Sequence, residues 1–240
     1  MSARRNTAVL LAGGVGTRAG LGYPKQLAPL GGRPLMEHTL AVFDAHPDVD
    51  DIVVMMAPGH LEAVHAMVRT GGYGKVRQVL EGAGTRTATT LRALDALGPE
   101  DRKVLLHDAV RPLVPPAVIA ACLAALDTDG AVTAAIPSAD TVVEVGPDDT
   151  VRSVLSRATL RRVQTPQGFR LAVIRAAYAR AADDPGFEAT DDCSVVLRYT
   201  PEVPVRLVPG DERNLKVTGP LDVHLAEQLL ELGRSGDPPR

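Results

Sequence analysis

Two segments of the sequence place charged side chains directly after short apolar runs. The first is a glycine-rich turn with a lysine further along, and it reads Leu11-Ala12-Gly13-Gly14-Val15-Gly16-Thr17-Arg18, then Lys25. Glycines let a backbone approach a ligand closely, and consecutive N–H groups in such a turn bind anions. With Arg18 and Lys25 added, the segment predicts a polyphosphate site. Its spacing fits neither a dinucleotide fingerprint nor a P-loop; the structural alternative is a turn that only closes a βα unit.

The second segment follows another apolar run and reads Leu106-His107-Asp108-Ala109-Val110-Arg111-Pro112. Open α/β sheets bind ligands at the carboxyl ends of their strands. Mg²⁺ prefers one or two carboxylates plus phosphate oxygens, so Asp108 is predicted to hold Mg²⁺ against the polyphosphate. The structural alternative is that Asp108 caps the next helix and pairs with Arg111. His107 is interpreted as a packed or hydrogen-bonded histidine.

The elements that position these segments alternate between short apolar runs and longer stretches of helical period. This pattern predicts an α/β fold with a mostly parallel sheet covered by helices. We expect strands at 7–12, 51–57, 76–80, 103–107, 131–136 and 203–208, and helices at 34–45, 116–126, 171–182 and 221–232. A chain of 240 residues fits one domain, predicted to span 1–240.

Residues 137–162 interrupt this alternation. Two β-rich pieces, 141–145 and 151–155, flank the turn Gly146-Pro147-Asp148-Asp149, which predicts a β-hairpin arm. A two-stranded arm is seldom stable alone. We therefore expect the arm to project from the domain and to pack on a second subunit, giving a homodimer.

Composition excludes several classes of partner. The net charge is −3, so no overall field would attract nucleic acid or an anionic membrane. The two cysteines, Cys122 and Cys193, form no CxxC pair, which argues against disulfides and structural zinc and favours the reducing cytoplasm. The apolar run 8–12 is too short for a signal peptide or a membrane span. These features predict a soluble cytoplasmic protein.

Three further segments, 82–90, 163–169 and 214–218, extend the pattern over nearly the whole chain. Together the five segments resemble Rossmann-like nucleotidyltransferases and, among them, the 2-C-methyl-D-erythritol 4-phosphate cytidylyltransferases. The resemblance implies a three-layer sandwich that transfers CMP from CTP to a small polyol phosphate and releases pyrophosphate. The ribitol-5-phosphate cytidylyltransferases are a related alternative.

The resemblance also implies roles for individual residues. Three residues are implied to be catalytic, on the reacting phosphates: Arg18, Lys25 and Lys216. The implied nucleotide contacts are Ala12, Gly13, Gly14, Gly82, Arg86, Thr89 and Asp108, of which Asp108 also holds the metal. The implied contacts to the polyol phosphate are Arg111, Thr141, Arg157 and Thr165. Thr141 and Arg157 would act across the dimer interface.

Some residues separate the two related families. Gly14 and Val110 favour the ribitol-5-phosphate enzymes, whereas the run 164–169 and the acids Asp191 and Asp192 favour the isoprenoid enzymes. Ala88 stands where the family generally has an acid. We interpret Asp191 and Asp192 as a helix cap rather than as proton-transfer groups, and Cys193 as a small buried residue.

The expected chemistry needs no side chain that acts as a general base. A phosphate acceptor with a second pKa near 6 is mostly a dianion at neutral pH and can attack the α-phosphorus of CTP directly. The protein's task is then positioning and neutralisation of charge. Two other classes stay open: a regulatory module that binds CTP without turnover, and an NAD-dependent dehydrogenase, whose fingerprint the sequence lacks.

Overall fold

The computed structural model describes residues 5–14, 23–184, 186 and 189–235. Its centre is a seven-stranded sheet with the strand order β11-β7-β10-β6-β1-β4-β5. The strands are β1 (Arg5–Ala12), β4 (Asp51–Met56), β5 (Val76–Glu81), β6 (Arg102–Asp108), β7 (Ala131–Pro137), β10 (Arg161–Arg170) and β11 (Val205–Pro209). Strand β10 runs antiparallel to both of its neighbours, and the other pairs are parallel. The α/β fold with a mostly parallel sheet is confirmed.

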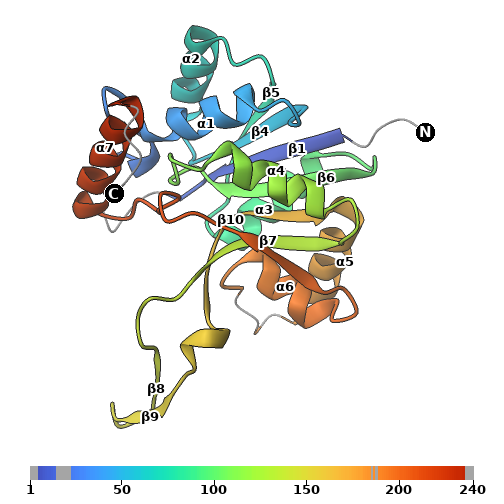
Figure 1. Cartoon of the computed structure of the whole chain (residues 1–240). Helices are drawn as coiled ribbons and strands as arrows, with labels where there is room; N and C mark the ends of the chain where they lie inside the picture. The colour runs from blue at the N-terminus through green and yellow to red at the C-terminus, as the bar shows by residue number, and fades with distance from the viewer. Residues whose placement is uncertain (1–4, 15–22, 185, 187–188, 236–240) are drawn as a thin grey trace.

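Helices cover both faces of this sheet (Figure 1). They are α1 (Leu35–Ala45), α2 (Leu61–Gly71), α3 (Arg86–Ala96), α4 (Pro116–Ala125), α5 (Leu171–Ala181), α6 (Asp192–Tyr199) and α7 (Pro220–Ser235). Phe43 and Ile119 belong to the core on the face covered by α1, α2 and α4. Leu94, Ile174 and Val195 belong to the core on the other face, under α3, α5 and α6. The three predicted layers are therefore present.

The central strands are continuous apolar runs because they are buried on both faces. All six residues of β4 are buried, as are the last six of β1. The six predicted strands correspond to β1, β4, β5, β6, β7 and β11, with small differences at their ends. The four predicted helices correspond to α1, α4, α5 and α7, and α7 begins at Pro220.

Strand β10 is the main element that the pattern did not predict. Its middle contains Gln164, Thr165, Pro166 and Gln167, which interrupt any apolar run and mask a central strand. The structure buries these side chains, and the ladder to β7 shifts register between Val163 and Gln167. The next residue, Gly168, is glycine because a Cβ there would lie 2.8–2.9 Å from side chains of β6, β7 and Leu126.

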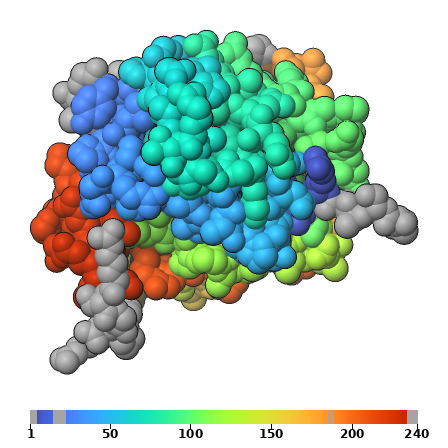
Figure 2. All heavy atoms as spheres, turned by 90° about the horizontal axis from the view of Figure 1, so that it is seen from above, coloured from blue at the N-terminus to red at the C-terminus, as the bar shows by residue number. Residues whose placement is uncertain are grey.

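A short segment and α7 close one end of the sheet. The segment contains the 3₁₀ turn η2 (Lys25–Leu27), then β2 (Pro29–Leu30) and β3 (Arg33–Pro34). Figures 1 and 2 both show α7, in red, beside this blue segment. Leu30, Val217 and Ala226 belong to the small core that joins them. This packing brings η2 and the chain before α7 to the same end of the molecule.

The predicted hairpin is present and projects from the body (Figure 1). It consists of β8 (Val143–Val145) and β9 (Val151–Val154), which pair antiparallel, and the turn η3 (Arg157–Thr159) follows. Apolar side chains on this arm are exposed, including Val145, Val151 and Val154. Within the described part of the chain, no helix has the length and apolar character needed to cross a membrane.

Candidate active site

The glycine-rich turn and the start of α3 pack against each other beside the carboxyl end of β1. A Cβ on Gly13 would lie 2.9 Å from the Thr89 hydroxyl, and a Cβ on Gly82 would lie 2.8 Å from the Cα of Gly13. Glycine is therefore required at both positions by close approach. Gln26 from η2 donates hydrogen bonds to the carbonyls of Ala12 and, at 2.8 Å, Gly14. These contacts hold the described part of the turn, and Arg18 lies outside the described residues.

Thr89 has a supporting position in this arrangement. The hydroxyl accepts a hydrogen bond from the Ala83 N–H at 2.9 Å and donates to the Thr85 carbonyl at 2.8 Å. Thr85 caps α3, and its side chain accepts from the Ala88 N–H. Thr89 thus holds the loop after Gly82, and Arg86 becomes the first residue of α3.

Asp108 lies at the carboxyl end of β6 among three cations. Its carboxylate is 3.0 Å from Lys216 Nζ, 3.4 Å from Arg111 Nε and 3.9 Å from Arg86 Nε. Burial by itself would raise the pKa of Asp108, but Lys216, Arg86 and Arg111 lower it to about 2. The carboxylate is therefore ionised at neutral pH, and the cluster carries more positive than negative charge.

The structure shows one part of the structural alternative, the pairing of Arg111 with Asp108, whereas the N-cap of the next helix, α4, is Pro115 and not Asp108. Arg111 also donates to the Asn214 carbonyl at 2.8 Å. Asn214 in turn donates to the Thr165 carbonyl at 2.7 Å. These bonds connect the chain before Lys216 to β6 and β10, so Lys216 reaches Asp108 from a distant part of the sequence.

Thr165 supports the end of β6 from the neighbouring strand β10. Its hydroxyl accepts from the Asp108 N–H at 3.1 Å and lies 3.0 Å from His107 Nδ1. His107 is fully buried, and burial lowers its pKa to about 4. It is therefore a neutral, packed histidine beside the Phe43 ring, as the sequence suggested.

Asp192 is a member of the cluster that sequence reasoning assigned only to a helix cap. The cap is Asp191, which forms a capping box with Ser194. Asp192 is fully buried and lies 2.6 Å from Arg86 Nη1. The consecutive acids in the segment 190–192 were the available signal, but nothing in the sequence places them beside α3.

Three other predicted residues lie on η2 and on the projecting arm. Lys25 lies in η2. The pKa of Asp222, in the first turn of α7, is lowered mainly by hydrogen bonds from Thr218, and the charge of Lys25 adds to this effect. Thr141 and Arg157 are exposed and belong to the projecting arm, where Arg157 donates to the Ala139 carbonyl at 3.0 Å. Within one chain, the hairpin β8–β9 of this arm lies away from the sheet that contains β6 (Figure 1).

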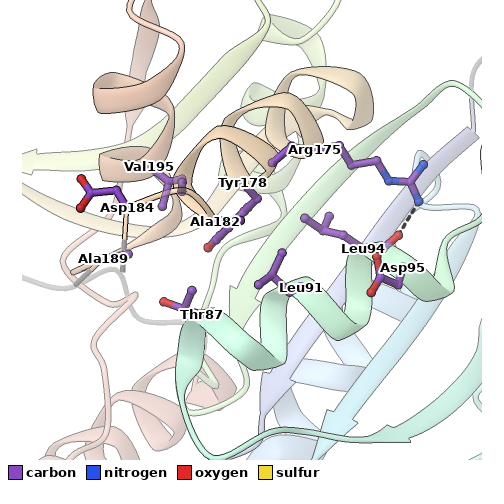
Figure 3. Close-up of a pocket in the computed structure, with 12 residues that line it drawn as sticks. Thr87, Leu91, Leu94, Asp95, Arg175, Tyr178, Ala182, Asp184, Ala189 and Val195 are labelled. Atoms are coloured by element: carbon purple, nitrogen blue, oxygen red, sulfur yellow. Dashed lines mark hydrogen bonds between the residues drawn. The ribbon is translucent and has the colours of Figure 1, made fainter. Parts of the chain in front are cut away.

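A separate open pocket of about 540 Å³ lies between α3, α5 and α6. Figure 3 shows Leu91, Leu94, Tyr178 and Val195 around it, with acidic side chains at its edges. Its one arginine, Arg175, donates to the Leu94 carbonyl. An apolar lining with its cation already engaged does not suit a polyphosphate, so the Asp108 cluster is the better candidate site.

The comparisons with known proteins identify the family of the chain. The sequence model of the family described as "IspD: 2-C-methyl-D-erythritol 4-phosphate cytidylyltransferase" matches residues 7–232. The chain belongs to this family. It is 50% identical to the 2-C-methyl-D-erythritol 4-phosphate cytidylyltransferase of Thermobifida fusca, over 95% of this chain and 94% of the relative. The chain is therefore an enzyme of the cytidylyltransferase type.

The chain is also similar to a solved structure and to a bifunctional relative. The crystal structure of 4-diphosphocytidyl-2C-methyl-D-erythritol synthase from Anaerococcus prevotii superposes with a TM-score of 0.85 at 28% identity, covering 95% of this chain and 99% of that one. The bifunctional ribulose 5-phosphate reductase/CDP-ribitol pyrophosphorylase Bcs1 of Haemophilus influenzae is 39% identical. That match covers 96% of this chain but 49% of Bcs1.

Proposed function

We propose that this enzyme transfers CMP from CTP to 2-C-methyl-D-erythritol 4-phosphate and releases pyrophosphate. The observation that carries the proposal is the group of Arg86, Arg111 and Lys216 around Asp108 at the carboxyl end of β6. Such a site has a surplus of positive charge for a triphosphate and an acceptor phosphate. Family membership supplies the identity of the two substrates.

The reaction follows from charge and position. A phosphate oxygen of the acceptor attacks the α-phosphorus of CTP, a new P–O bond forms, and the bond to the pyrophosphate breaks. Two anions must approach each other, so the main contribution of the protein is neutralisation by fixed cations. Asp108 neutralises only part of this positive charge, and phosphate oxygens are the natural partners of the cations when substrates bind.

The nucleotide residues fall into two groups. Ala12, Gly13, Gly14 and Gly82 offer backbone to the phosphates and base, because side chains are absent or small there. The cations that act on the phosphates are Arg18, Lys25 and Lys216, and Arg86 is a further nucleotide contact. Lys216 is the best placed of the described cations to reach a reacting phosphate, since its side chain is 44% exposed while its Nζ is already beside Asp108.

The residues present fit a Mg²⁺ ion bound together with the triphosphate. Asp108 supplies one carboxylate, and no group of three or more acidic, histidine or cysteine ligands is found among the described residues. Mg²⁺ commonly takes one or two carboxylates and completes its shell with phosphate oxygens and water. When bound, the ion would neutralise phosphate charge, and Asp108 would hold it.

The arm extends this proposal to a homodimer. Thr141 and Arg157 belong to the arm that projects from the body, and the arm exposes several valines that a second copy would cover. The arm of the partner would bring polar groups to the acceptor phosphate near Arg111 and Thr165.

The compartment that fits the two unpaired buried cysteines is the cytoplasm.

The test is pyrophosphate release from CTP and Mg²⁺ with two acceptors in parallel, 2-C-methyl-D-erythritol 4-phosphate and D-ribitol 5-phosphate. We expect the first acceptor to give the higher kcat/KM. The similarity to Bcs1 makes the second acceptor the informative competitor, and preference for it would overturn the assigned substrate. Binding of CTP without release from either acceptor would favour a regulatory module instead.

A further inference from the structure

The guanidinium of Arg86 contacts the buried carboxylate of Asp192, which also has a second partner. Asp192 Oδ2 lies 2.6 Å from Arg86 Nη1, and Asp192 Oδ1 accepts a hydrogen bond from the Tyr178 hydroxyl at 2.6 Å. Asp192 is fully buried, and Tyr178 is 4% exposed. A buried carboxylate needs such partners, because removal from water otherwise disfavours the charged form.

The backbone of Asp192 is fixed separately by the sheet. The Gln167 side chain on β10 accepts hydrogen bonds from the N–H groups of Asp192 and Cys193, at 3.1 and 3.3 Å. The same side chain donates to Asp191 at 2.7 Å. With the main chain anchored in this way, the rotation of the Asp192 carboxylate depends on Tyr178 and Arg86.

Arg86 extends from this buried pair to the site edge. Its Nε lies 3.9 Å from Asp108, and 29% of its side chain is exposed, whereas Asp192 and Tyr178 do not reach the edge. Burial by itself would lower the pKa of Arg86, and Asp192 and Asp108 more than compensate for it. Arg86 is therefore a charged group held at a defined position before any nucleotide binds.

We propose that Tyr178 and Asp192 are positioning residues that hold the guanidinium of Arg86 ready for CTP. This inference rests on the proposed function, in which Arg86 contacts the nucleotide. A long side chain that is already fixed loses little rotamer freedom on binding. Without the Tyr178 hydroxyl, the Asp192 carboxylate loses one of its two fixed partners and can rotate, and Arg86 then has to be ordered by the ligand.

The chain provides a matched control for the loss of a tyrosine hydroxyl. Asp184 accepts hydrogen bonds from Tyr199 at 2.8 Å and from Arg198 at 3.0 Å, so the same three residue types meet on the same side of the sheet. Tyr199→Phe therefore removes a tyrosine–aspartate hydrogen bond that is less buried and whose carboxylate pairs with Arg198 instead of Arg86.

The experiment compares Tyr178→Phe with Tyr199→Phe in steady-state kinetics and in CTP binding by titration calorimetry. We expect Tyr178→Phe to raise the KM and the dissociation constant for CTP by about 3- to 10-fold, the factor for ordering one long side chain. The KM for the acceptor and the kcat should stay within about twofold of the unsubstituted enzyme, and Tyr199→Phe should change none of these constants. Equal CTP constants for the two variants would overturn the positioning role.

A second background separates positioning from a general loss of stability. Arg86→Lys keeps a positive charge for Asp192 but lacks the planar guanidinium. In that background, Tyr178→Phe should no longer change the CTP constants by more than about twofold, because the group it positions is gone. An undiminished effect would mean that Tyr178 acts by another route. If the unsubstituted enzyme releases no pyrophosphate, the proposed function is refuted. The positioning role can still be tested in that case, because the two phenylalanine variants can be compared by their binding of CTP.

Discussion

Replacement of Lys216 by methionine tests whether the cluster at Asp108 performs the chemistry. The ammonium lies 3.0 Å from Asp108, while 44% of the side chain is exposed. Methionine keeps most of the length and removes the charge. If the ammonium neutralises charge that develops on the reacting phosphates, its loss should cost about 2.7–4 kcal/mol of transition-state stabilisation, or about 100- to 1,000-fold in kcat.

The effect on folding should be small by comparison. Exposed ion pairs commonly contribute about 0–1 kcal/mol to the free energy of unfolding. The two remaining cations, Arg86 and Arg111, still accompany Asp108, so its carboxylate does not become an isolated buried charge. The pKa of Asp108 should rise, because Lys216 is the strongest of the three cations that lower it.

Lys103→Met is the matched control, because Lys103 lies at the opposite end of the same strand. Its Nζ donates to Asp127 at 2.6 Å and to the Leu123 carbonyl at 2.9 Å, and the residue is 7% exposed. Loss of these buried bonds should lower the free energy of unfolding by about 1–3 kcal/mol with little change in kcat. The two lysine variants should therefore show opposite patterns.

The assay is pyrophosphate release at saturating CTP and acceptor, together with urea unfolding of each variant. A kcat for Lys216→Met within about threefold of the unsubstituted enzyme would refute the reasoning, since no single electrostatic donor would then matter at this position. A loss of activity that only follows a loss of stability would refute it equally.

Three further outcomes are expected. Asp108 has a pKa of about 2 against an ordinary 3.8, so its ionised form stabilises the fold above about pH 4, and this contribution is lost as the pH falls through about 2. The free energy of unfolding of the unsubstituted protein should therefore exceed that of Asp108→Asn by roughly 2 kcal/mol less at pH 2 than at pH 6, as measured by urea unfolding. Gly168→Ala should lower the free energy of unfolding by about 1–3 kcal/mol through overpacking, because its Cβ would lie 2.8–2.9 Å from three side chains. Gly84→Ala, whose Cβ would have nothing within 4 Å, should leave the melting temperature nearly unchanged. Glutamate at Val145 and Val154 together should convert a dimer to a monomer in sedimentation velocity without changing the unfolding of the body, since both side chains are more than half exposed in one chain; an unchanged sedimentation coefficient at the dimer value would contradict the role of the arm.

Much of the fold could be predicted from local sequence. Strands β1, β4 and β6 are apolar runs because both of their faces are buried, and the alternation with helices gives the class. The hairpin was indicated by its turn, and of the two acids that were expected to cap a helix, Asp191 is the cap. Helices α2, α3 and α6 were left unassigned, although α2 and α3 are as long as the predicted helices α1 and α5.

Strand β10 shows where local pattern is insufficient. Its polar middle, 164–167, is compatible with a central strand only because other segments satisfy it, as when Gln164 donates to the Asp211 carbonyl at 2.8 Å. Those partners lie between 24 and 58 positions away in the sequence, for example 47 positions for Gln164 and Asp211. No reading of the segment itself could supply them.

The sequence by itself determined which residues were available for phosphate chemistry: a glycine-rich turn, an acid after a buried strand, and a set of cations whose order resembles one enzyme family. Only the tertiary structure decided how these groups meet. Arg86 and Lys216 lie on opposite sides of Asp108 in sequence, and strand order brings both to the end of β6. The partners of Asp192 were likewise decided by packing, because a buried carboxylate takes whichever donors the surrounding helices place within about 3 Å.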